Sequence, residues 1–290
     1  MYSMTVFADL IFPALELAGA KQVVEIGADT GGMSRMLAEY CLKRGGEFVS
    51  VDPAPTPDFR IWVAFNPQVR HLAMPSLDAF AELENIDAWI IDGDHNWYTV
   101  YHELIGVENV CRRDGKPVLA FFHDVAWPCA RRDMYYAPER IPPEYRQPFS
   151  RDNGVTLENP GLLESRGFRG GNHFAWAERE GGPRNGVLTA IEDFMAGRYR
   201  EGREFGFAEI PGVMGLGVLF DLDTPWSAAL ANFLMPFHHN RLLRLMEDDR
   251  QRNALRAHDL QDDAAEAAAH MAIATGGHRP SIGTISDDAA

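Results

Sequence analysis

The chain is poor in cysteine and contains no long apolar run. Its 290 residues include three cysteines, Cys41, Cys111 and Cys129, and no CxxC pair. An odd number of cysteines at irregular spacing argues against a disulfide framework and a thiolate zinc site, and is typical of a reducing compartment. No apolar run approaches the ~20 residues that a membrane-spanning helix requires.

The features of a secretory signal are also missing from the N-terminal segment. Asp9 and Glu16 interrupt its apolar stretch, and no basic residue precedes Lys21. A signal peptide would begin with a basic region and continue into an uninterrupted apolar core. We therefore expect a soluble protein of the cytoplasm.

Basic residues are outnumbered by acidic ones. The 27 Lys and Arg residues against 42 Asp and Glu residues give a net charge of −15 at pH 7. Such a surface repels phosphate backbones, so nucleic acid is not an expected partner. Hydrophobic residues make up 46% of the chain and charged residues 24%, which is typical of a globular protein and excludes a wholly disordered one.

Strand-like and helix-like segments alternate through the first half of the chain, which predicts an α/β fold with a parallel sheet flanked by helices. The predicted strands cover residues 22–26, 47–51, 69–73, 86–91 and 116–122. The predicted helices cover residues 33–43, 77–83 and 96–111, and residues 53–69 are expected to form a proline-rich loop with at most one short helix. Polar motifs follow these strands, as in sheets that bind ligands along their carboxyl edge.

The second half of the chain is less regular. Six prolines interrupt residues 127–171, where we expect an irregular insertion that serves as a lid or substrate region. A helix at 186–196 and two strands, at 205–210 and 216–222, are predicted to complete the domain. These last two strands are expected to form an antiparallel edge of the sheet.

Three parts are predicted in all: a domain over 1–225, helices over 226–260 that are split at Pro236, and a tail over 261–290. The tail is rich in Ala, Asp, Gly and Ser, so we expect it to be mostly disordered after a short Ala-rich helix. The residues that form an apolar stripe before the tail are Leu242, Leu243, Leu245 and Met246. This stripe either packs on the domain or forms a homodimer contact.

A glycine-rich loop separates the first predicted strand from the first predicted helix. Gly27 and Gly31 allow positive φ and close approach of a ligand to the backbone, and free N–H groups at the helix start favour a negative group. Asp29 stands where the dinucleotide pattern G-x-G-x-x-G has its second glycine, which argues against NAD.

The spacing E-x-G-x-x-x-G resembles the first motif of class I S-adenosylmethionine-dependent methyltransferases, which implies a Rossmann-like sheet. By this resemblance the loop wraps the methionyl part of the cofactor, and Asp52, after the second strand, accepts the two ribose hydroxyls. The residues expected to bind the cofactor are Glu25, Gly27, Asp29, Thr30, Gly31, Ser34, Asp52, Ser76 and Asp92. The alternative is an ordinary glycine turn beside a surface aspartate.

A second polar cluster follows the fourth and fifth predicted strands. Asp92, Asp94 and His95 come after one strand, and His123 and Asp124 end the next. Neighbouring parallel strands bring these ends together. Carboxylates suit Mg²⁺, whereas imidazole extends the choice to Mn²⁺, Fe²⁺ or Zn²⁺.

This cluster resembles that of the metal-dependent O-methyltransferases, a group that includes catechol, caffeoyl-CoA and macrolide-sugar enzymes of the macrocin and mycinamicin type. The resemblance implies a divalent cation on Asp92, His123 and Asp124, with His95 as the catalytic base. His123 departs from the family, which has Asp, Glu or Asn there, so it is a ligand, a neighbour that orients the ligands, or the base itself. Alternatively, Asp94 or Asn96 caps the helix and His123 is simply a buried histidine.

Aromatic and basic residues open the insertion. Trp127, Arg131, Tyr135 and Tyr136 follow the fifth strand and are expected to contact the methyl acceptor. Aromatic faces beside arginines suit a sugar, an aromatic ring or an anionic carrier, although they could equally form a small local core. We therefore expect O-methylation of a small molecule of sugar or natural-product type. The alternatives are a metal-independent methyltransferase, a metal-dependent hydrolase and a cofactor-binding protein without turnover.

Overall fold

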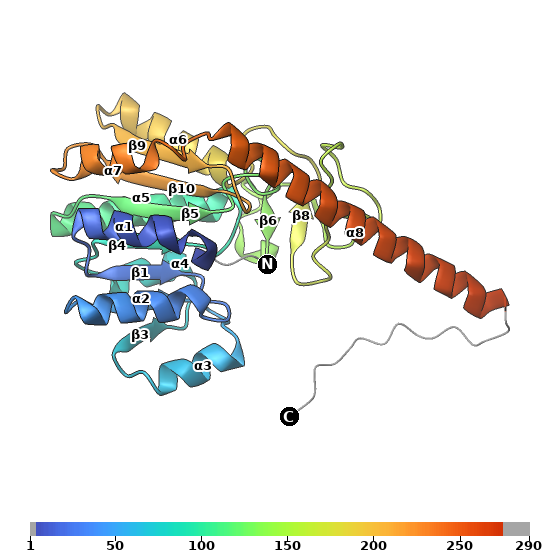
Figure 1. The fold of residues 1–290 in the computed structure, drawn as a ribbon, viewed down its shortest axis with the longest axis horizontal. Coiled ribbons are helices and arrows are strands. Elements are labelled where there is room, and N and C mark those ends of the chain that lie inside the picture. Colours follow the sequence, from blue (N-terminus) through green and yellow to red (C-terminus); the bar gives the residue numbers. More distant parts are fainter. Residues whose placement is uncertain (1–3, 275–290) are drawn as a thin grey trace.

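A seven-stranded sheet forms the centre of the computed structural model, which describes residues 4–274 (Figure 1). The strands lie in the order β3-β2-β1-β4-β5-β10-β9. Their bounds are β1 Val23–Ile26, β2 Phe48–Val51, β3 Val69–Leu72, β4 Ala88–Ile91, β5 Leu119–His123, β9 Phe205–Ile210 and β10 Leu216–Asp221. The first five pair in parallel, whereas β10 runs antiparallel to both β5 and β9. The predicted Rossmann-like fold with an antiparallel edge is confirmed.

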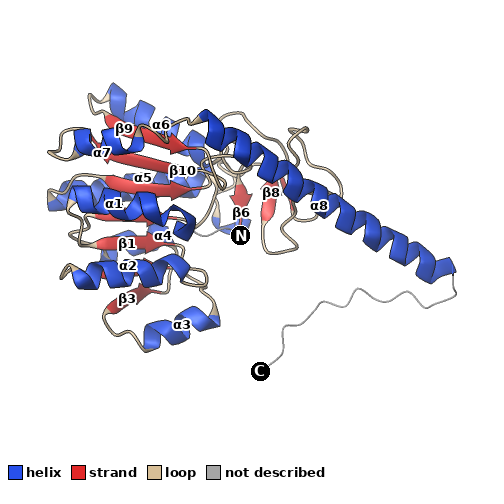
Figure 2. Ribbon diagram, in the orientation of Figure 1, coloured by secondary structure: helices blue, strands red, loops and turns tan. Residues whose placement is uncertain are grey.

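Helices cover both faces of this sheet (Figure 2). The helices of the domain are η1 Met4–Phe7, α1 Ala8–Ala18, α2 Gly32–Lys43, α3 Pro57–Ala64, α4 Ser76–Ala79, η2 Phe80–Glu82, α5 Trp97–Asp114, α6 Val187–Arg200 and α7 Ser227–Leu234. Successive strand residues point to opposite faces, so Val24 packs with α5 and α6, whereas Val23 packs with α1, α2 and α7. Every residue of β1, β2 and β4 is buried, and burial on both faces explains why these strands, apart from Glu25 and Ser50, are apolar rather than alternating.

The insertion has more structure than its prolines suggest. Its elements are β6 Met134–Tyr135, η3 Pro138–Arg140, β7 Phe149–Ser150 and β8 Ala175–Ala177, and the three strands form a small antiparallel sheet. The Arg132 guanidinium is fully buried and donates to the carbonyls of Ala177 and Pro160. The expectation of an irregular segment is therefore wrong for part of this region, because short strands and a buried cation organise it.

Helix α8 (Arg241–Ala274) corrects the prediction for the tail. It follows the predicted break at Pro236 but continues through residues 261–274, crosses the insertion and extends beyond it (Figure 1). Alanine is a strong helix former, and Asp262 and Asp263 form ion pairs with Arg169 and Arg166 of the insertion. The rest of the predicted disordered tail, 275–290, lies outside the described residues. Within residues 4–274, no helix is long and apolar enough to cross a membrane.

Candidate active site

The glycine loop after β1 is held between the end of β4 and helix α3. Gly27 has φ 91°, and a Cβ atom there would lie 2.1 Å from the carbonyl oxygen of Asp92. Gly31 has φ 77°, and its Cβ would lie 2.4 Å from the ring of Phe59. Glycine is therefore required at both positions, and the loop passes directly beside the end of β4.

Asp52 fixes the shape of this loop. Its Oδ2 accepts hydrogen bonds from the backbone amides of Ala28 (2.9 Å) and Asp29 (3.1 Å), and its Oδ1 accepts one from Ala54 (2.8 Å). A carboxylate offers about four acceptor sites, so these three bonds leave capacity for a further donor. Asp52, the residue predicted to bind the ribose hydroxyls, thus also fixes the conformation of the glycine loop.

Glu25 lies buried beneath the loop and accepts a hydrogen bond from Ser34. Burial raises the pKa of Glu25 to about 8, and the hydrogen bond from Ser34 opposes this rise. Asp29 and Thr30 are exposed at the loop surface, and Ser76 is the first residue of α4. The predicted cofactor residues therefore lie along the carboxyl ends of β1, β2, β3 and β4.

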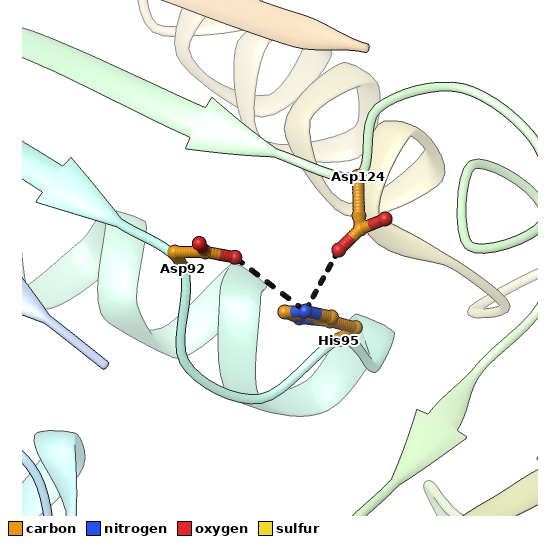
Figure 3. Close-up of side chains that lie close together, drawn as sticks. All are labelled: Asp92, His95 and Asp124. Atoms are coloured by element: carbon orange, nitrogen blue, oxygen red, sulfur yellow. Dashed lines mark ion pairs between the residues drawn. The ribbon is translucent and has the colours of Figure 1, made fainter. Parts of the chain in front are cut away.

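Asp92, His95 and Asp124 converge on one point beyond β4 and β5 (Figure 3). The Nε2 atom of His95 lies 2.8 Å from Oδ2 of Asp124 and 3.7 Å from Oδ1 of Asp92. The side chains of His95 and Asp124 are almost completely buried, whereas that of Asp92 is 18% exposed. Asp92 is therefore the member of the cluster nearest to solvent.

Local structure explains how the cluster is assembled. Ile91 pairs with Phe122, so the residues that follow β4 and β5 emerge side by side. Asn96 caps α5 by accepting a hydrogen bond from the amide of Thr99, which fixes the backbone next to His95. Asp124 has φ 60°, a left-handed conformation that aspartate tolerates better than most residues.

His123 contacts the same two carboxylates. Its Nδ1 lies 3.1 Å from Oδ1 of Asp92 and 3.3 Å from Oδ2 of Asp124, and its Nε2 donates to the carbonyl of Val213. Burial lowers the pKa of His123, but the two carboxylates outweigh burial and raise it to about 11. With both nitrogens facing acceptors, the ring acts as a cation that orients Asp92 and Asp124. Of the three roles predicted for His123, this geometry favours the neighbour that orients the ligands over the metal ligand and the base.

The donor set fits a divalent cation. One ligand atom from each of Asp92, His95 and Asp124 lies within 4.8 Å of the other two. The Nε2 atom of His95 is buried and, despite its short distance to Asp124, lacks the alignment of a hydrogen bond. Two carboxylates and one imidazole are common ligands of Mn²⁺, Fe²⁺ and Zn²⁺.

The predicted substrate residues divide into two groups. Tyr136 lies beside the cluster, with its ring centroid 6.1 Å from that of His95. Trp127, three residues after Asp124 in the sequence, is half-buried. Tyr135 is fully buried and donates to Asp133, so it cannot contact a substrate. Arg131 forms a bidentate ion pair with Glu192 of α6. This pair engages the guanidinium predicted to contact the methyl acceptor.

Sequence reasoning missed three residues near the site. Glu103 is fully buried on α5, and Glu247 of α8 binds the turn that contains Val213. Glu103 falls on the apolar face of α5, three residues after Val100 and four before Val107, so its burial could have been predicted. The contact of Val213 with His123 has no sequence signal.

Comparisons with known proteins bear on this geometry. Residues 24–125 match the family model of a methyltransferase domain, and no curated protein matches the chain. Among solved structures, the chain is similar to an SAH-bound methyltransferase of Podospora anserina, at 14% identity over 77% of this chain and 80% of that one, with a TM-score of 0.46. It is also similar to a Staphylococcus aureus protein assigned as a caffeoyl-CoA O-methyltransferase, at 12% identity over 76% and 84% of the two chains, with a TM-score of 0.45.

The matched segment contains the glycine loop, Asp52, and every member of the acidic and histidine cluster. It ends directly after Asp124, before the insertion begins. Residues 24–125 of this chain are a methyltransferase domain.

Proposed function

We propose that this protein transfers the methyl group of S-adenosylmethionine to a hydroxyl group of a small molecule of sugar or natural-product type. The observation that carries the proposal is the contact between the two halves of the site, where Gly27 lies against the backbone of Asp92. A cofactor held by the glycine loop would therefore lie next to the Asp92, His95 and Asp124 cluster.

Methyl transfer depends chiefly on alignment. The sulfonium loses its positive charge as the methyl group leaves, so nucleophile, methyl carbon and sulfur must be held in line. The glycine loop, with Asp52 fixing its amides, is suited to hold the cofactor rigidly. Tyr136, beside His95, is suited to contact the acceptor.

A hydroxyl is a weak nucleophile until its proton is removed. We propose that His95 accepts this proton at Nε2, and that the nearby carboxylate of Asp124 stabilises the resulting imidazolium. Asp92 and Asp124 would hold a divalent cation, which lowers the pKa of a hydroxyl bound to it. In a second arrangement, His95 is a third ligand and does not act as the base.

One observation favours a metal-independent methyltransferase as the second candidate. The charged ring of His123 already pairs with both Asp92 and Asp124, so part of their negative charge is balanced without a metal ion. The predicted homodimer through residues 226–260 and the cytoplasmic location stay predictions. Of the stripe residues, Leu242, Leu245 and Met246 are more than half exposed, and Leu243 packs against the core.

Calorimetry with S-adenosylmethionine tests the assignment of the cofactor. We expect binding in the micromolar to millimolar range, weakened about tenfold or more in Asp52→Asn because one charged acceptor is lost. Asp58→Asn, an exposed residue of α3, is the matched control and should bind as the parent does. Absence of binding to the parent chain would contradict the proposal and favour a hydrolase.

Removal of metal distinguishes the two candidate functions. With a cation on Asp92 and Asp124, dialysis against EDTA should abolish methyl transfer, and added Mg²⁺ or Mn²⁺ should restore it. Turnover is measured by release of S-adenosylhomocysteine, with S-adenosylmethionine binding as the control for intact structure. Full activity after chelation would exclude the cation and leave His95 as the sole proton acceptor.

A further inference from the structure

The turn between β9 and β10 adopts an unusual backbone conformation beside the site. Val213 has φ 47° and Met214 has φ 66°, both in the left-handed region. A β-branched residue such as valine rarely adopts positive φ, so the turn must be held by its surroundings. The segment runs from Pro211 to Gly215 and joins the ends of the two strands.

Glu247 of α8 holds this turn. Its Oε2 accepts a hydrogen bond from the amide of Val213 and its Oε1 accepts one from the amide of Met214, both at 2.9 Å. Arg250 and Gln251 bind the same carboxylate from the helix. Burial raises the pKa of Glu247, but its hydrogen bonds to Arg250 and Met214 outweigh burial and lower it, so the group is an anion at neutral pH.

The same turn contacts the candidate active site. The carbonyl of Val213 accepts a hydrogen bond from Nε2 of His123 at 3.2 Å, and the carbonyl of Met214 accepts one from the amide of Ala126 at 2.8 Å. Ala126 lies two residues after Asp124, so the turn supports both the histidine and the backbone that carries the aspartate. Gln251 adds a hydrogen bond to the carbonyl of Trp127.

We propose that Glu247 is a positioning residue for methyl transfer: it fixes the Val213–Met214 turn, and the turn fixes His123 against Asp92 and Asp124. This inference rests on the proposed function, because it assigns Glu247 a role in the same site. Helix α8 is thereby part of the catalytic framework, although it lies more than 100 residues from the cluster in the sequence.

Kinetics of Glu247→Ala and Glu247→Gln test the proposal. Glutamine keeps one acceptor oxygen, so we expect kcat to fall in the order parent, Gln, Ala, with a loss of about 10- to 100-fold in the alanine variant. The KM for S-adenosylmethionine should change little, because the glycine loop is untouched. Glu266→Gln, which removes one of the two ion pairs of α8 with Arg166, is the control and should retain the parent kcat.

Nitrogen NMR of the histidine rings supplies a readout that needs no turnover. We expect the ring signals of His123 to shift in Glu247→Ala, while those of His102 on α5 stay in place and thermal unfolding remains cooperative. An unchanged kcat and unchanged His123 signals in a folded variant would overturn the proposal, as would an equal loss in Glu266→Gln. If the parent chain binds no S-adenosylmethionine, the proposed function fails, whereas a His123 shift still supports the positioning contact.

Discussion

Replacing Asp124 with asparagine is expected to lower kcat by about 10²- to 10⁴-fold, the range associated with loss of acid–base assistance. The carboxylate lies 2.8 Å from Nε2 of His95 and 3.3 Å from Nδ1 of His123, so its charge acts on both rings. Asparagine has the same shape and tolerates the φ of 60° at this position, so the substitution removes charge with little change of backbone.

Single-turnover kinetics with S-adenosylmethionine measure this loss, and calorimetry shows whether the cofactor still binds. Asp221→Asn is the matched control, since Asp221 ends β10 at the opposite edge of the sheet and accepts hydrogen bonds from Val118 and Arg203. That variant should retain the parent kcat. If Asp124→Asn turns over at the parent rate while folded, the Asp124 carboxylate has no role in the reaction.

The positions of the polar residues at the carboxyl edge of the sheet could be predicted, because each follows a recognisable strand and parallel strands end at the same edge. Strand endings in a parallel sheet lie on one edge, so the amino-acid pattern alone is enough to place Asp52, Asp92 and Asp124 along the same edge of the sheet. Asp92, His95 and Asp124 do converge, as expected from neighbouring strands. The same reasoning left three roles open for His123, because pattern alone does not show which way each ring nitrogen faces.

The features that could not be predicted from the sequence depend on contacts between residues far apart in the chain. The burial of Tyr135 depends on its bond to Asp133 and on the small sheet of the insertion, neither of which has a local signature. The helix through residues 261–274 is longer than the short Ala-rich helix expected, and it forms ion pairs with arginines almost 100 residues earlier. Glu247 directly follows the apolar stripe of residues 242–246, but that pattern does not show which part of the domain the helix meets, so only the fold reveals its contact with Val213.

Stability should fall as pH rises from about 5 to above 8, and Glu103 should account for a large part of the change. This carboxyl is fully buried in α5, where burial raises its pKa to about 8 and the nearby Asp94 adds to the rise. Between its ordinary value of 4.5 and about 8, the native state keeps a proton that the unfolded state has lost. Rising pH therefore favours unfolding over this interval.

Glu103→Gln isolates this contribution, because glutamine mimics the protonated acid and does not titrate. The interval from 4.5 to about 8 corresponds to an upper bound of roughly 5 kcal/mol, so we expect a relative loss of about 2–4 kcal/mol for the parent chain. Urea unfolding of both chains at pH 5 and pH 8.5 measures it. Other titrating groups, including Glu25, act in both chains and cancel in the difference. Parallel stability curves for the two chains would show that Glu103 is already ionised in the native protein, with a compensating cation or water beside it.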